Sequence, residues 1–96
     1  MSQKETERRA YHVYGTVQGV GFRYRARAAA ELLSLSGWVE NLDDGSVAIE
    51  AQGAPEALDR FVETICRGSN YIEITKIVTE NVPVLAKQYG FSTKGW

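Results

Sequence analysis

The most constraining feature of this chain is the order in which its hydrophobic residues switch between strand spacing and helix spacing. Alternation with a period of two predicts a strand over residues 9–17, and helical spacing predicts a helix over residues 22–33. Two further strands are separated by Asp44-Gly45, a dipeptide typical of a tight hairpin, because that turn needs positive φ. Helical spacing returns at Pro55, which suits the first position of a helix, and Gly68 supplies its stop.

The last part of the chain predicts two more strands. Residues 71–80 are rich in Ile, Val and Thr, and their alternation slips near Ile77, which indicates a bulge or an early end. Residues 89–94 predict a short fifth strand at an edge of the sheet. The order βαββαβ with an added strand favours an α+β fold, a ferredoxin-like sandwich with two helices on one face of an antiparallel sheet.

The chain of 96 residues is long enough for one domain with a modest core, and its sequence contains no linker, repeat or low-complexity segment. We therefore expect a single domain over residues 9–96, preceded by a flexible N-terminal tail over residues 1–8. A formal net charge of −1 argues against a general binder of nucleic acid or of membrane surfaces. Because the polar start lacks the apolar segment of a secretion signal and no apolar run is long enough for a membrane span, we expect a cytoplasmic protein.

The single cysteine and the single histidine limit the metal chemistry that the chain can support. Cys66 alone excludes an internal disulfide, and His12 leaves no second partner for a Cys/His zinc site, so we expect no metal. Cys66 falls on the apolar stripe of the second helix, which predicts a small core residue and not a nucleophile. His12 lies on the first predicted strand, where a structural or exposed role is favoured over a catalytic one.

Three closely spaced glycines join the first predicted strand to the first helix: Gly15, Gly19 and Gly21. Glycine lets backbone N–H groups converge, and the helix that begins near Phe22 adds its unpaired first-turn N–H groups and positive dipole end. This stretch predicts an anion site, in which Arg23 would pair with a bound phosphate. The alternative is that the glycines only shape a tight turn, since the loop lacks the endings of a Walker A loop and of a dinucleotide fingerprint.

Asn41 is out of place in a strand, where asparagine is disfavoured. On its own it is equally well explained as an Asx-type residue before the hairpin turn. Together with the glycine loop, however, it completes a recognisable pair of blocks. Gly15-x-Val17-Gln18-Gly19-Val20-x-Phe22-Arg23 and Gly37-Trp38-Val39-x-Asn41-x-x-Asp44-Gly45-x-Val47 resemble the two signature blocks of the acylphosphatases.

This resemblance implies an enzyme that hydrolyses the carboxyl-phosphate bond of small acyl phosphates to a carboxylate and inorganic phosphate. In that family the arginine of the first block binds the phosphate with the loop amides, and the asparagine of the second block positions the attacking water. Those positions are Arg23 and Asn41 here. The resemblance further implies substrate-binding amides at Gln18, Gly19, Val20, Gly21 and Phe22. It also implies a five-stranded antiparallel sheet under two helices, with no cofactor, and we expect a monomer whose loop accepts inorganic phosphate or other anions.

The sequence departs from the family pattern at Ser34, where a glycine commonly ends the first helix, and in the last strand, which lacks an apolar residue two after Phe91. Two other functions share the order of elements. RNA-recognition and small-molecule regulatory domains use it, but the predicted third strand, residues 46–51, has no aromatic residue for stacking. Similar domains also begin the longer hydrogenase-maturation carbamoyl transferases, whereas a chain of 96 residues favours a free-standing enzyme.

Overall fold

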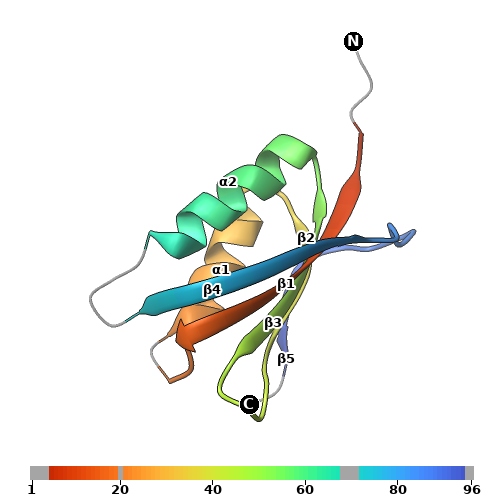
Figure 1. Ribbon diagram of the computed structural model, residues 1–96. Coiled ribbons are helices and arrows are strands. Elements are labelled where there is room, and N and C mark those ends of the chain that lie inside the picture. The colour runs from red at the N-terminus through yellow and green to blue at the C-terminus, as the bar shows by residue number, and fades with distance from the viewer. Residues whose placement is uncertain (1–4, 20, 68–71, 95–96) are drawn as a thin grey trace.

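The computed structural model describes residues 5–19, 21–67 and 72–94. The elements in chain order are β1 (Glu7–Thr16), α1 (Phe22–Leu32), β2 (Ser36–Asn41), β3 (Val47–Gly53), α2 (Pro55–Cys66), β4 (Glu73–Val82) and β5 (Phe91–Lys94) (Figure 1). The predicted order of strands and helices is therefore confirmed, with small shifts at the boundaries. Gly68, the predicted helix stop, and Tyr71, the predicted start of the fourth strand, lie outside the described residues.

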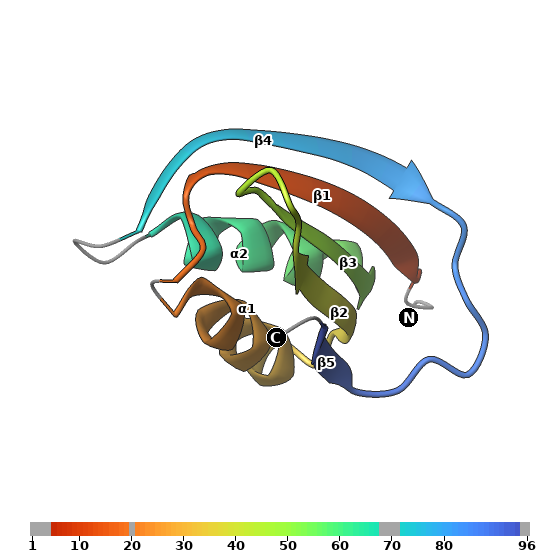
Figure 2. The ribbon, with the colours of Figure 1, turned by 90° about the horizontal axis from the view of Figure 1, so that it is seen from below.

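The strands form one sheet in the order β4-β1-β3-β2-β5, and both helices cover the same face of it (Figure 2). This is the predicted ferredoxin-like α+β sandwich. Alternate strand residues point toward the helices and form the core with the apolar helix stripes. The core includes Tyr11, Val13, Val39, Val47 and Ile49 from the sheet, and Phe22, Ala26, Ala30, Leu58, Phe61 and Ile65 from the helices.

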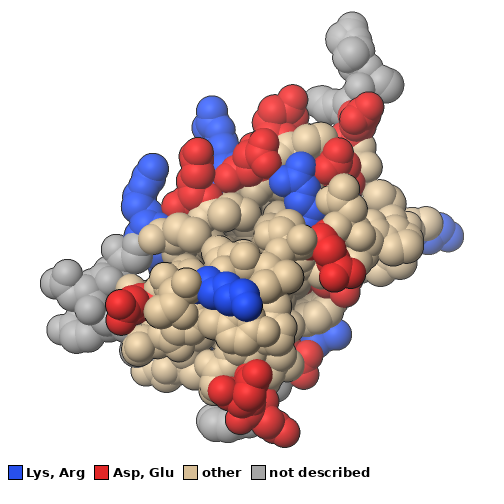
Figure 3. Space-filling view, in the orientation of Figure 1, with Lys and Arg blue, Asp and Glu red and all other residues tan. Residues whose placement is uncertain are grey.

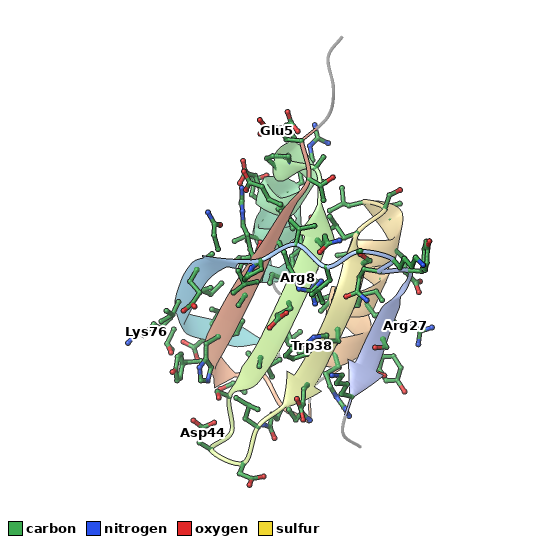
Figure 4. All side chains as sticks on the ribbon, turned by 90° about the vertical axis from the view of Figure 1, so that its right-hand side faces the viewer. Glu5, Arg8, Arg27, Trp38, Asp44 and Lys76 are labelled. Atoms are coloured by element: carbon green, nitrogen blue, oxygen red, sulfur yellow. The ribbon has the colours of Figure 1, made fainter. Side chains whose placement is uncertain are left out.

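The fifth strand runs parallel to its neighbour, so the sheet is mixed and the expected all-antiparallel arrangement is wrong at β5. The pairs β1–β3, β1–β4 and β2–β3 are antiparallel as predicted. β5 runs parallel to β2 because of the path that residues 83–90 take. β4 ends at Val82, which lies in one row across the sheet with Arg8, Gln52 and Ser36. The chain crosses the sheet at that end (Figure 4), so β5 starts where β2 starts and must run in the same direction.

Arg8, which the sequence analysis places in a flexible tail, belongs to β1 and is buried beneath this crossing segment (Figure 4). Its Nε donates to Glu50 Oε1 at 2.7 Å, and its Nη1 donates to Gln88 Oε1 at 2.9 Å. Gln52 holds the same segment, because its amide both donates to Leu85 O and accepts from Leu85 N at 2.9 Å. The strand starts earlier than predicted because these long-range partners stabilise a polar residue that looks exposed in the sequence. Residues 1–4 of the predicted tail lie outside the described residues.

The predicted irregularity in the fourth strand is a bulge. The β1–β4 register is regular up to Tyr14, after which Gly15 pairs with Ile74 and Thr75 is the extra residue, close to the predicted slip at Ile77. Gly15 is required here, since its φ is +133° and a Cβ would lie 2.0 Å from a backbone oxygen of β4. The bulge in β4 thus lies opposite the end of β1, just before the chain enters the glycine loop.

Cys66 is exposed, so the prediction that it is a core residue is wrong. The buried stripe of α2 consists of Leu58, Phe61 and Ile65, and Cys66 is the last helical residue, one step around the axis from Ile65. Partial burial raises the pKa of the Cys66 thiol, which disfavours the reactive thiolate.

The first helix ends with a serine in a left-handed conformation. Ser34 has a φ of 60°. Leu35 N–H donates to Ala30 O at 2.8 Å and Ser34 N–H donates to Glu31 O at 3.2 Å, which is the bond pair of a Schellman motif. Glycine is the usual residue at this point of that motif, because a Cβ is strained at positive φ.

We expect Ser34→Gly to raise the free energy of unfolding by about 0.5–1 kcal/mol, since it removes strain at a positive φ and leaves the two backbone bonds intact. Thermal and urea denaturation would measure the gain as a Tm increase of a few degrees. Ser34→Ala is the matched control, because alanine keeps the Cβ and should bring no gain. A Ser34→Gly variant with unchanged or reduced stability would contradict this account of the helix end.

Candidate active site

The loop after β1 and the end of β2 lie at the same end of the molecule (Figure 1) and enclose a pocket of about 200 Å³. Its lining consists of Val17, Gly19, Gly21, Phe22, Arg23, Tyr24 and Asn41. Arg23 and Asn41, which the sequence analysis singled out from different elements, thus border one hollow. Of the predicted loop amides, Val20 lies outside the described residues.

The loop backbone takes a left-handed conformation at two glycines. Gly19 and Gly21 have φ values of +76° and +82°, and a Cβ on either would meet nothing within 4 Å, so their conformation and not a lack of space calls for glycine. Gly21 is also the N-cap of α1 and has no side chain with which to cap the first-turn N–H groups. The start of α1, with its uncapped N–H groups and the positive end of the helix dipole, therefore borders the pocket through Gly21, Phe22 and Arg23.

Arg23 is fixed from the edge of the sheet. Its Nη1 donates to the backbone oxygen of Lys94, in β5, at 2.9 Å. The Lys94 ammonium in turn lies 4.5 Å from the centre of the Trp38 ring on β2. The last strand thus supplies a hydrogen-bond partner for the Arg23 guanidinium beside the pocket.

Asn41 is the last residue of β2 and points to the helix side of the sheet, as buried Val39 does two residues earlier. Its Oδ1 is buried and accepts no hydrogen bond from the residues that the structure describes. A buried acceptor without a donor costs about 1–3 kcal/mol. The hairpin turn is held instead by Asp44, whose Oδ1 accepts from Ser46 N–H at 2.9 Å. Asn41 thus borders the pocket and carries a buried acceptor with no donor among the described residues.

Gln18 joins the loop to the hairpin through its side chain, a role that the sequence analysis missed. Its Nε2 donates to the backbone oxygens of Leu42 at 2.7 Å and Ser46 at 2.8 Å. Both hydrogens of the amide are thus used on the turn that follows Asn41. The only sequence signal was a two-donor side chain next to the glycines, which does not reveal partners so distant along the chain.

Among the described residues, no three His, Cys, Asp or Glu side chains lie where they could together hold a metal ion. No helix in the described part of the chain is long and apolar enough to cross a membrane. On the face shown in Figure 3, Lys and Arg side chains are interspersed with Asp and Glu.

Comparisons with known proteins extend this picture. A family model described as acylphosphatase matches residues 9–93. The acylphosphatase of Clostridium perfringens (strain SM101) is 41% identical over 86 residues, which cover 90% of this chain and 97% of the relative. The crystal structure of acylphosphatase from Bacillus subtilis matches with a TM-score of 0.87 and 39% identity over 93% of this chain and 99% of that one. Full-length HypF, crystallised in a phosphate- and nucleotide-bound form, matches with a TM-score of 0.89 and 26% identity over 98% of this chain but only 12% of HypF.

Proposed function

Because this chain belongs to the acylphosphatase family of enzymes that hydrolyse acyl phosphates, we propose how its own residues carry out that reaction. The loop from Gln18 to Arg23 captures the phosphate of a small acyl phosphate, and Asn41 positions the attacking water. The observation that carries this proposal is that Arg23, the glycine loop and Asn41 line the same pocket.

Phosphate capture uses two kinds of donor. Backbone N–H groups from Gln18 to Phe22 surround the equatorial oxygens, and the Arg23 guanidinium pairs with them as a planar fork. The positive φ values of Gly19 and Gly21 and the hydrogen bond from Arg23 to Lys94 O support the proposal that donors are arranged before the substrate arrives. Preorganised donors of this kind stabilise the charge that spreads over the phosphoryl oxygens in the transition state.

The chemistry of the leaving group explains why so few side chains suffice. An acyl phosphate expels a carboxylate whose conjugate acid has a pKa of about 4, so no general acid is needed. Within the described part of the chain, the residues that line the pocket include no Asp, Glu or His. Positioning and charge stabilisation therefore account for the rate enhancement.

Asn41 cannot act as a base, because an amide does not accept a proton at ordinary pH. Its Oδ1, buried and without a donor among the described residues, instead accepts a hydrogen bond from the water. The water oxygen bonds to phosphorus while the bond from phosphorus to the acyl oxygen breaks, and the carboxylate leaves with the electron pair. The proton of the water passes to the phosphate itself, so the products are a carboxylate and inorganic phosphate.

The proposed phosphate site also predicts which acyl phosphates are substrates. The donors recognise the phosphate that all acyl phosphates share, so small acyl groups of different shapes are substrates. We expect the enzyme to work as a cytoplasmic monomer that needs neither metal nor cofactor.

The direct test is hydrolysis of benzoyl phosphate by the purified protein, with and without a chelator and with inorganic phosphate added. We expect turnover that the chelator does not reduce and that inorganic phosphate inhibits competitively, because both compounds occupy the loop. A folded protein that binds phosphate but leaves benzoyl phosphate intact would make this chain a binding module and would refute the proposal.

A further inference from the structure

A continuous chain of hydrogen bonds leads from the helix-free face of the sheet to the hairpin turn beside Asn41. His12, on β1, lies with its Nε2 2.6 Å from Ser46 Oγ and its Nδ1 3.2 Å from Tyr14 Oη. The His12 and Tyr14 rings stack with centroids 4.3 Å apart. Ser46 also contacts Asp44, which is labelled at the hairpin in Figure 4.

From Asp44 to His12 Nε2, the donors and acceptors of these hydrogen bonds have one consistent arrangement. The Asp44 carboxylate only accepts, and it accepts from both the N–H and the hydroxyl of Ser46. These bonds lower the pKa of Asp44, the hydroxyl bond most strongly. Since the single hydroxyl hydrogen of Ser46 is used on Asp44, Ser46 Oγ must accept from His12 Nε2–H. A neutral His12 then accepts from Tyr14 Oη–H at Nδ1.

Ser46 transmits this anchoring to the site. It is 3% exposed. Its carbonyl oxygen accepts from Gln18 Nε2 at 2.8 Å and from Leu42 N–H at 2.9 Å. The turn is therefore held at two points. His12 of β1 contacts it from the helix-free face, and Gln18 of the loop after β1 contacts it beyond the end of the strand. Asn41 immediately precedes this turn.

We propose that His12 is a positioning residue for acyl phosphate hydrolysis, which fixes Asn41 opposite the phosphate loop by anchoring the hairpin turn through Ser46. The inference rests on the proposed function and extends it to a residue that does not line the pocket. Phosphate capture by Arg23 and the loop amides depends chiefly on α1 and β5, and the loop meets these hydrogen bonds only through the Gln18 side chain. Turnover should therefore depend on His12 more than phosphate binding does.

The test compares His12→Ala with His12→Gln, whose amide N–H can occupy the position of Nε2–H. For benzoyl phosphate we expect His12→Ala to lower kcat by about tenfold, the effect of one lost hydrogen bond, with KM and the inhibition constant of inorganic phosphate nearly unchanged. His12→Gln should recover most of the lost kcat. Glu80→Gln, on the same face of the neighbouring strand β4, is the control and should match the wild type, and circular dichroism would check that every variant is folded.

Three results would overturn the inference: a folded His12→Ala variant with unchanged kcat, a loss confined to KM, or a His12→Gln variant as impaired as His12→Ala. Combining His12→Ala with Gln18→Ala gives a second readout. If both side chains act through Ser46, the combined loss in kcat is smaller than the product of the single losses, whereas independent effects multiply. Failure of the proposed function has a different signature, because the wild type would then hydrolyse no benzoyl phosphate, and this inference would fall with it.

Discussion

Replacing Arg23 by alanine is expected to lower kcat/KM for benzoyl phosphate by about a thousandfold or more. Of the described residues that line the pocket, Arg23 is the only one with a charged side chain. Its guanidinium meets a substrate with two negative charges and a transition state in which the charge spreads over three oxygens. Backbone amides alone would have to hold both, so the loss should affect binding as well as turnover.

Arg27→Ala is the matched control for this result. Arg27 lies one turn further along α1, and its replacement by alanine removes the same charge. Its Nε, however, pairs with Glu31 at 3.1 Å on the exposed side of the helix. Its activity should stay close to that of the wild type. Arg23→Lys should fall between the two, since it keeps the charge and loses the planar fork. Steady-state kinetics and calorimetric titration with phosphate would measure both effects, and a folded Arg23→Ala variant that retains a tenth of the activity would contradict the assignment.

The elements and the site blocks could be predicted because they depend on local patterns. Hydrophobic periodicity specifies which residues face a core, and Asp44-Gly45 is typical of a hairpin whatever else the chain contains. A tight turn that needs glycine could be predicted at Gly19 and Gly21 because positive φ is a local property, and the structure gives both residues positive φ. The resemblance to the acylphosphatases then linked the loop to Asn41.

Apart from the misplaced Cys66, the errors and omissions arise from contacts between residues far apart in the sequence. The direction of β5 depends on the path of residues 83–90 across one end of the sheet, which no periodicity encodes. Arg8 looks like a tail residue until Glu50 and Gln88 are brought beside it. The side chain of Gln18 and the ring of His12 also contact the hairpin turn from distant positions in the sequence. Their proposed roles could therefore be inferred only from the structure.

Asn41→Ala is expected to lower kcat by about a hundredfold to a thousandfold, while the inhibition constant of inorganic phosphate stays within about twofold of the wild type. The reason is the proposed role of Asn41, which is to orient the water with no contribution to phosphate capture by the loop. Asn81→Ala, in the edge strand β4, removes the same side chain far from the pocket and should keep full activity. Parallel kinetics on the three proteins measure the difference, and a proportional loss of phosphate binding in Asn41→Ala would assign Asn41 to substrate binding instead.

Stability separates this role from a structural one. A hydrogen-bonded asparagine that supported the hairpin would destabilise the fold when truncated, by about 1 kcal/mol or more. Asn41 Oδ1 is buried without a donor among the described residues, so its removal relieves a desolvation cost, and Asn41→Ala should unfold at the same temperature as the wild type or higher. Loss of turnover with no loss of stability is the result expected for a residue kept for its chemistry. A variant that loses both together would instead place Asn41 with the residues that hold the hairpin turn.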